Sequence, residues 1–254
     1  MKLIKYVFLD ILRSKVIIGY TLFLLLVSLS LFSLDSNPVK ASLGLLNIIL
    51  IVLPLVSIVF STIHFYNSYE FIELLVSQPV RRKGILISQF AGVSFSMALA
   101  FLIGVGIPVI IFCCNATGLT LVIAGVMLTL VFSAIGFLVS VFTNDKATGI
   151  GIAILLWFFF SLVYDGLVLL ILFSFSDYPI EKLIMALTMA NPVDLSRVFV
   201  LLQLDVSALM GYSGAMFRDF FGTGTGMLLS FCIILFWIAL PFFFAVKVFN
   251  RKDL

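Results

Sequence analysis

The chain has 254 residues, of which 63% are hydrophobic and 11% are charged, and its mean hydropathy is +1.30. A soluble domain averages about 45–50% apolar and roughly 25% charged residues, and a soluble domain of this size cannot hide so much apolar surface from water. The composition therefore excludes a water-soluble protein, and the net charge of +3 becomes a clue to orientation in a membrane.

The apolar runs are continuous and about 20 residues or longer, as a membrane-spanning α-helix requires. A β-barrel would instead show short segments of alternating polarity. We expect an all-α polytopic membrane protein in which residues 1–254 form a single transmembrane domain. Residues 1–15 are amphipathic and predict a helix in the plane of the interface. In chain order, the six predicted spans are 16–34, 43–66, 85–113, 119–142, 148–175 and 226–249.

Six spans place both termini on one side of the membrane. With a cytoplasmic N-terminus, eleven of the fifteen basic residues fall inside and four fall outside, and this bias sets orientation. The four outer residues are Lys40, Lys182, Arg197 and Arg218. We therefore expect a multi-pass protein with both termini in the cytoplasm.

Side chains suited to catalysis or metal binding are scarce. A single histidine, His64, excludes bis-histidine haem sites and the His-Glu-x-x-His helix of metalloproteases. Soft metals such as Cu(I) favour Cys and Met ligands, although methionines at helical spacing usually serve as packing. We expect no catalytic residue, metal site or cofactor in this chain. The residues that leave a soft-metal site open are Cys113, Cys114, Met185 and Met189.

The segment between the second and third spans predicts a short amphipathic helix on the cytoplasmic side. Asn67 and Glu70 have the spacing of a capping box, and Pro79 would end the helix about three turns later. We assign Phe71, Leu74, Leu75 and Gln78 to one face, and Glu70, Glu73 and Ser77 to the other. Arg81 and Arg82 then mark re-entry at the anionic leaflet. A plain interfacial connector is the alternative, but the acidic face favours a groove on another protein.

Asp165 lies inside the fifth apolar run. A charged residue within the membrane costs at least about 2.5–3.5 kcal/mol and has a functional role by default. Its spacing places it on one helix face with Trp157, Ser161 and Tyr164. No basic residue within a span is an evident partner, so we expect Asp165 to be neutral and hydrogen-bonded between helices, or to face water.

About fifty apolar-rich residues join the fifth and sixth spans. Residues 179–190 predict one short helix, and Asn191-Pro192 predicts the start of a second, with Asp194 in its first turn. Arg197 lies three residues further on and can pair with Asp194 or with a partner. We expect Asn191, Pro192, Asp194 and Arg197 to form an outward docking element. The alternative is a helix that floats at the lipid boundary.

Together these features resemble the permeases of type-two ABC exporters. The N-terminal interfacial helix, the six spans and the acidic helix before a Gln-Pro-x-Arg-Arg turn carry the resemblance. Within that family, the chain is most similar to the membrane subunits of transporters that mature nitrous oxide reductase. That finer similarity rests on residues 72–82, on Trp157 with Asp165, and on residues 191–197.

The resemblance implies a homodimer in a bacterial inner membrane. It implies a separate cytoplasmic ATPase, which holds ATP and Mg and binds residues 67–79 as a coupling helix. It also implies a periplasmic NosD-like protein on the outward segments, acting in assembly of the copper-sulfur centres of nitrous oxide reductase, and no nucleic-acid partner. Two alternatives remain: a permease that exports a peptide, lipid or drug, and a membrane assembly scaffold that transports nothing.

Overall fold

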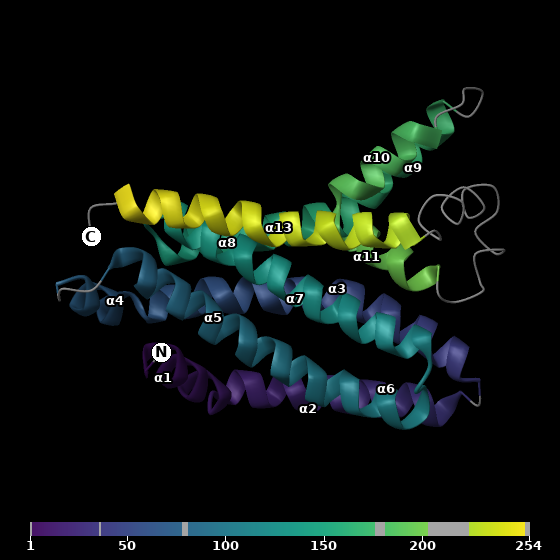
Figure 1. The fold of residues 1–254 in the computed structure, drawn as a ribbon, viewed down its shortest axis with the longest axis horizontal. Coiled ribbons are helices and arrows are strands. Elements are labelled where there is room, and N and C mark those ends of the chain that lie inside the picture. Colours follow the sequence, from purple (N-terminus) through teal and green to yellow (C-terminus); the bar gives the residue numbers. More distant parts are fainter. Residues whose placement is uncertain (1, 36, 78–80, 176–180, 203–223, 252–254) are drawn as a thin grey trace.

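The structure is a computed structural model that describes residues 2–35, 37–77, 81–175, 181–202 and 224–251. Over these ranges the chain is helical and contains no strand (Figure 1). The helices are α1 (Lys2–Leu12), α2 (Lys15–Leu34), α3 (Pro38–Asn67), α4 (Tyr69–Val76), α5 (Arg82–Phe101), α6 (Ile107–Phe112), α7 (Ala116–Phe142), α8 (Lys146–Phe158), α9 (Tyr164–Ser174), α10 (Glu181–Ala190), α11 (Pro192–Leu201) and α13 (Gly224–Arg251), with π-helical segments η1 (Leu102–Gly106) and η2 (Phe159–Val163).

Six stretches of the described chain are long and apolar enough to cross a membrane, which confirms the all-α polytopic fold. They are Lys15–Leu34, Pro38–Asn67, Arg82–Phe112, Ala116–Phe142, Lys146–Ser174 and Leu228–Arg251. The second begins five residues before its predicted start. The reason is local: the Asn37 side chain accepts a hydrogen bond from the Val39 backbone N–H at 3.0 Å, and Pro38 occupies the first helical position.

Helix α1 and the C-terminal end of α13 lie toward the same end of the helical bundle. Figure 1 shows α1, α4 and the C-terminal end of α13 there, with α6 toward the other end. We call these the α4 end and the α6 end. This placement agrees with the even number of spans inferred from the sequence.

Helix α7 is the central helix of the bundle. Two-thirds of its most apolar window is buried, against 6% for the span formed by α8, η2 and α9. Its packing with α3 uses small residues, which let membrane helices approach closely. Gly136 of α7 lies against Ile58 and Ser61 of α3, and other small buried residues of the two helices are Ser57, Ser133 and Ser140.

Helices α3 and α7 approach each other closely at Gly136. A Cβ atom there would lie 2.7 Å from the Ile58 carbonyl oxygen and 3.0 Å from the Ser61 Cβ. We expect Gly136→Ala to push the helices apart and lower the free energy of unfolding by about 1–3 kcal/mol, measured as thermal stability in detergent. Gly151→Ala is the control, because an added Cβ there meets nothing within 4 Å. Equal stability of the two variants would contradict this packing.

The N-terminal helix α1 is amphipathic, as predicted, and its apolar face packs against α5. Val7 and Ile11 are buried with exposed fractions of 4% and 2%. Gly92 of α5 permits the contact, since a Cβ there would lie 2.5 Å from Val7 Cγ1. The helix is thereby fixed to the bundle.

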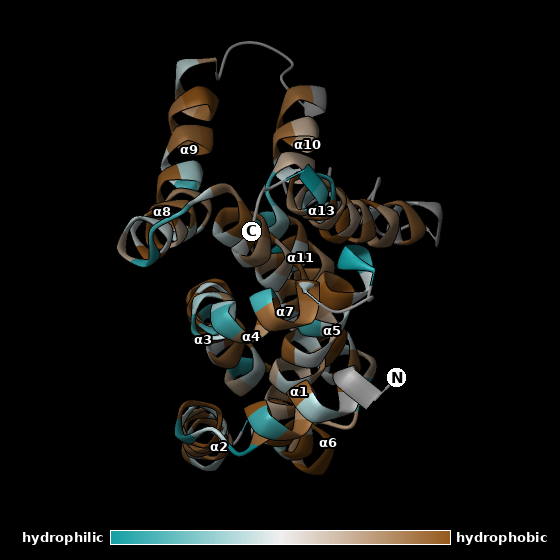
Figure 2. Ribbon diagram, turned by 90° about the vertical axis from the view of Figure 1, so that its left-hand side faces the viewer, coloured by the Kyte–Doolittle hydropathy of each residue, from teal (hydrophilic) through white to brown (hydrophobic). Residues whose placement is uncertain are grey.

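Helices α9 and α10 both project away from the bundle (Figures 1 and 2). The departure follows η2, in keeping with the tendency of π-segments to bend helices, and α9 has no buried residue. A 110° bend then separates α10 from α11, and α11 packs back against α7 and α13. Helix α11 therefore packs on the spans and does not float at the lipid boundary. Residues 176–180 and 203–223 lie outside the described chain.

Candidate functional site

Helix α4 is an amphipathic helix attached to the α4 end of the bundle. Ile72 and Leu75 are buried, with exposed fractions of 1% and 9%, and anchor it. The Phe71 ring lies 6.1 Å from the ring of Tyr6 on α1. Glu70 and Glu73 are exposed. The helix thus holds a fixed apolar face against the bundle and presents an acidic face outward.

Leu74 does not belong to the anchored face, contrary to the sequence prediction. It is 65% exposed. Residues four apart lie on the same side of an α-helix, so Leu74 lies directly beyond Glu70. The outward face therefore carries an apolar side chain beside two carboxylates, and we call Glu70, Glu73 and Leu74 the α4 outer face.

The predicted capping box is also wrong. The residue that precedes α4 is Ser68, which makes no side-chain capping bond, and Asn67 is the last residue of α3. The Asn67 Oδ1 instead accepts a hydrogen bond from Lys146 Nζ at 2.7 Å. Ser68 alone separates α3 from α4.

Polar contacts tie the end of α3 to three neighbouring elements. The His64 Nε2 and Gln89 Oε1 atoms lie 3.2 Å apart, linking α3 to α5, and the Tyr66 hydroxyl bonds the Thr143 side chain after α7. Lys146 begins α8, whose N-cap Asp145 accepts a hydrogen bond from the Thr148 backbone N–H. That bond, with a second from the Thr148 hydroxyl, lowers the pKa of Asp145 below its usual value.

The remaining residues predicted to take part in coupling are Arg81, Arg82 and Gln78. The two arginines lie at the start of α5, and Gln78 falls outside the described chain. Arg81 is exposed and precedes α5, and Arg82 is its first residue. Gln78 lies in the range 78–80, which the structure does not describe. The described coupling residues thus share the α4 end of the bundle, although the α4 outer face and the arginines belong to different helices.

The four residues predicted on one face of the fifth span contact different elements. The Trp157 Nε1 donates to the Ile51 carbonyl of α3 at 3.0 Å, and the Tyr164 hydroxyl donates to the Leu187 carbonyl of α10 at 2.7 Å. Ser161 is buried, and its hydroxyl has no hydrogen-bond partner within the described protein. Segment η2 lies between Trp157 and Asp165, and its wider turn breaks the 3.6-residue spacing on which the prediction relied.

Asp165 has a basic partner, which corrects the expectation that none was available. The Arg197 Nη1 donates to Asp165 Oδ2 at 2.9 Å and to Asp194 Oδ1 at 3.1 Å. The side chains of Arg197, Asp165 and Asp194 are 33%, 30% and 13% exposed. The predicted intramembrane group and the predicted docking group therefore meet at one ion-pair cluster.

Asn191 completes this cluster from the start of α11. Its Oδ1 accepts from the Val193 backbone N–H at 3.0 Å, which confirms the predicted N-cap. Its Nδ2 donates to the Phe160 carbonyl of η2 at 2.9 Å and to Asp194 Oδ2 at 3.0 Å. Asp165, Asn191, Asp194 and Arg197 form what we call the Arg197 cluster, which joins the bend of the fifth span to α11.

The sequence could not identify the Arg197 cluster because its two halves are far apart in the chain. Asp165 and Arg197 are separated by 32 residues, and they meet because α10 and α11 fold back onto the bundle. Asn191 and Pro192 are buried, so they shape the start of α11. Among the four predicted docking residues, Asp194 and Arg197 are the two with accessible surface.

The described residues contain no group of three or more His, Cys, Asp or Glu side chains that could hold a metal ion. The Ser42 hydroxyl donates to Cys113 Sγ at 3.6 Å, and Cys114 is exposed. Met185 and Met189 pack against the apolar core. Within the described chain, Cys113 therefore takes part in a hydrogen bond and the two methionines serve as packing.

Known proteins resemble this chain along much of its length. The ABC-2 family transporter proteins match residues 1–254. The chain is 31% identical over 200 residues to the probable ABC transporter permease protein NosY of Stutzerimonas stutzeri, covering 70% of this chain and 67% of that protein. It is 30% identical over 148 residues to the probable ABC transporter permease protein NosY of Pseudomonas aeruginosa, covering 54% of each.

Proposed function

We propose, because this chain belongs to the ABC-2 family of transporter proteins, that α4 is the element through which a separate cytoplasmic ATPase drives it. The chain is the permease subunit of an ABC transporter. In this proposal ATP and Mg are bound by the partner ATPase, and the permease contributes no catalytic group and no cofactor of its own.

The α4 outer face carries this proposal. Glu70 and Glu73 are exposed beside Leu74, while Ile72 and Leu75 hold the opposite face to the bundle. An amphipathic helix commonly binds a groove on another protein through a row of anchors. A groove with an apolar floor and basic rims would complement Leu74 and the two carboxylates.

The junction between α3 and α4 supports the coupling role. Asn67 and His64 connect it to α8 and α5 through Lys146 and Gln89. A force on α4 would therefore be shared by three spans. Side-chain contacts of this kind between rigid elements suit a mechanical link.

The finer function follows the NosY relatives. We propose that a homodimer of this chain in a bacterial inner membrane works with a periplasmic NosD-like protein in assembling the copper-sulfur centres of nitrous oxide reductase. The support is the 31% identity to one NosY over 70% of this chain. Reconstitution would distinguish transport of a sulfur species from transmission of motion without transport. A generic exporter or a passive scaffold would be recovered with different partners.

Helix α11 is our proposed outward docking element. Asp194 and Arg197 have the accessible surface for contact, whereas Asn191 and Pro192 set the helix start. Since Arg197 also holds Asp165, docking on α11 would act directly on the bend of the fifth span.

Recovery of partners in mild detergent tests the proposal. We expect the tagged full chain, purified from its native host, to bring down an ABC ATPase and a periplasmic protein of the NosD kind. An ATPase without the periplasmic protein would favour a generic exporter. Recovery of no ATPase would contradict the coupling role and favour a scaffold.

The orientation has its own test. In a variant without native cysteines, we expect Cys introduced at Ser77 to react only from the cytoplasmic side and Cys at Asn115 only from the periplasmic side. Ser77 follows α4 and Asn115 precedes α7, and both are exposed. A Cys at Lys182 should behave like Asn115. Labelling of Ser77 and Asn115 from one side would contradict the six-span arrangement.

A further inference from the structure

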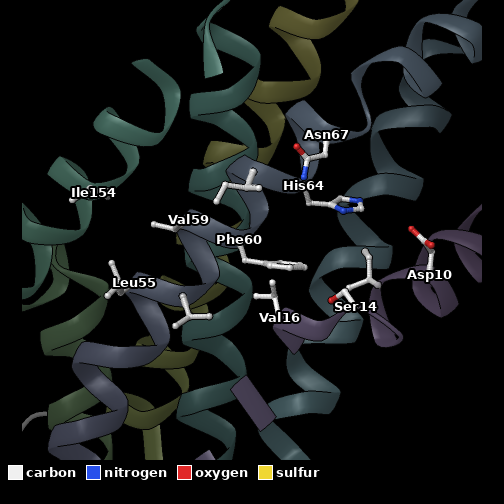
Figure 3. A pocket seen from close by; sticks show the side chains of 12 residues that line it. Asp10, Ser14, Val16, Leu55, Val59, Phe60, His64, Asn67 and Ile154 are labelled. Atoms are coloured by element: carbon white, nitrogen blue, oxygen red, sulfur yellow. The ribbon is translucent and has the colours of Figure 1, made fainter. Parts of the chain in front are cut away.

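A cavity of about 480 Å³ opens between α1, α2, α3 and α8 near the α4 end of the bundle. This volume falls in the range of about 300–1,000 Å³ typical of small-molecule sites. Figure 3 shows Asp10 and Ser14 on one side, with Leu55, Val59 and Ile154 on the other. The cavity is separate from the α4 outer face and from the Arg197 cluster.

The walls of this cavity divide into an apolar part and a polar part. Leu55, Val59 and Ile154 supply apolar surface. The polar side chains lie where α1 and α3 end, at the α4 end of the bundle. These are Asp10, Ser14, His64 and Asn67. An amphiphile whose tail enters the apolar part would therefore place its head at the level where α1 lies.

The charge at the polar part favours a cation. Of the twelve residues that line the cavity, Asp10 is the acid and none is Lys or Arg. Asp10 stands in the last turn of α1, where the helix dipole disfavours a carboxylate and a nearby cation would relieve it. The Phe60 ring also lines the cavity, and aromatic faces attract ammonium groups.

We propose that this cavity binds one phosphatidylethanolamine molecule of the surrounding bilayer, with an acyl chain against Val59 and Ile154 and the ammonium group beside Asp10. The ammonium head supplies the cation that Asp10 lacks among the lining residues. Outside the lining, Lys146 Nζ donates to the Oδ1 of the lining residue Asn67 at 2.7 Å, so a cation beside that end of the cavity could meet the lipid phosphate. The proposal is independent of the ATPase and of the cargo.

Lipid retention by the purified full chain tests this site. Native mass spectrometry would compare phosphatidylethanolamine with phosphatidylglycerol of the same acyl chains, each added to delipidated protein. We expect about a three- to fivefold preference for phosphatidylethanolamine, the size of one exposed ion pair. Asp10→Asn should abolish the preference, whereas Asp35→Asn, at the α6 end of α2, should keep it.

Filling the cavity provides the second arm. Ile154→Trp starts from an exposed side chain, so folding should survive, and we expect it to lose retention of both lipids. Ile51→Trp, on α3 outside the cavity, should retain them. Equal retention of the two lipids by the wild type would overturn the headgroup assignment. Unchanged lipid retention in Ile154→Trp would overturn the site. If the Ile154→Trp permease also lost its self-association while lipid retention stayed unchanged, the occupant of the cavity would be a second copy of the chain.

Discussion

Arg197→Met is expected to destabilise the outward half of the protein strongly, because Asp165 and Asp194 would lose the guanidinium that both contact. Removing one partner of a fully buried ion pair costs about 3–5 kcal/mol. Since the side chains of Arg197 and Asp165 are about a third exposed, we expect about 1–3 kcal/mol here. Thermal unfolding in detergent measures the loss, with Lys40→Met, at an exposed lysine in the first turn of α3, as the control.

Asp165→Asn separates a structural role of the Arg197 cluster from a functional one. The amide oxygen can still accept a hydrogen bond from Arg197, so we expect the fold to persist. If the cluster transmits motion between α9 and α11, ATPase-dependent function should fall in Asp165→Asn at nearly unchanged stability. Wild-type function in this variant would mean that the cluster merely braces α11.

A double-mutant cycle completes this test. We expect Arg197→Met and Asp165→Asn to be non-additive by about 0.5–3 kcal/mol, as for other residues in direct contact. Additive effects would show that the ion pair contributes nothing.

Reversal of both acids on α4, by Glu70→Lys and Glu73→Lys, should weaken ATPase binding about ten- to a hundredfold. Charges at an interface rim contribute modestly, but two like-charge contacts against a basic groove add repulsion. Both residues are exposed, so membrane insertion and thermal stability should remain. Binding of the purified ATPase to the reconstituted permease measures the effect.

Two controls complete the experiment on α4. Asp35→Lys reverses an acid at the α6 end of α2 and should leave ATPase binding unchanged. Leu74→Ala shortens the exposed apolar side chain beside the two acids and should weaken binding without altering charge. ATPase affinity and turnover that are unchanged in the double reversal would remove α4 from the coupling mechanism.

The sequence predicted the features that depend on local chemistry. Continuous apolar runs define the six spans, and the cap at Asn191 follows from a polar side chain before proline. The same signal at Asn37-Pro38 starts the second span five residues before its predicted start. The resemblance to type-two exporter permeases likewise agrees with the ABC-2 family match over residues 1–254. Each of these signals lies within a few residues of the element that it specifies.

The failures arise where tertiary contacts override a local pattern. The Asn67–Glu70 spacing imitates a capping box, but α3 continues through Asn67, whose amide bonds Lys146. The π-helical segment η2 changes the helical register of Asp165, and the spacing of apolar residues in the sequence does not indicate a π-helical turn. Its pairing with Arg197 requires α10 and α11 to fold back across 32 residues, which a single sequence does not reveal.

Site-specific photo-crosslinking from Leu74 tests the central claim most directly. A photoreactive residue at Leu74, 65% exposed on α4, would be compared with one at Leu167, 46% exposed on α9. In membranes that contain the whole transporter, we predict a crosslink to the ATPase from Leu74 and none from Leu167. A transporter that assembles with its ATPase but gives no ATPase crosslink from Leu74, or gives one from Leu167, would contradict the coupling role of α4.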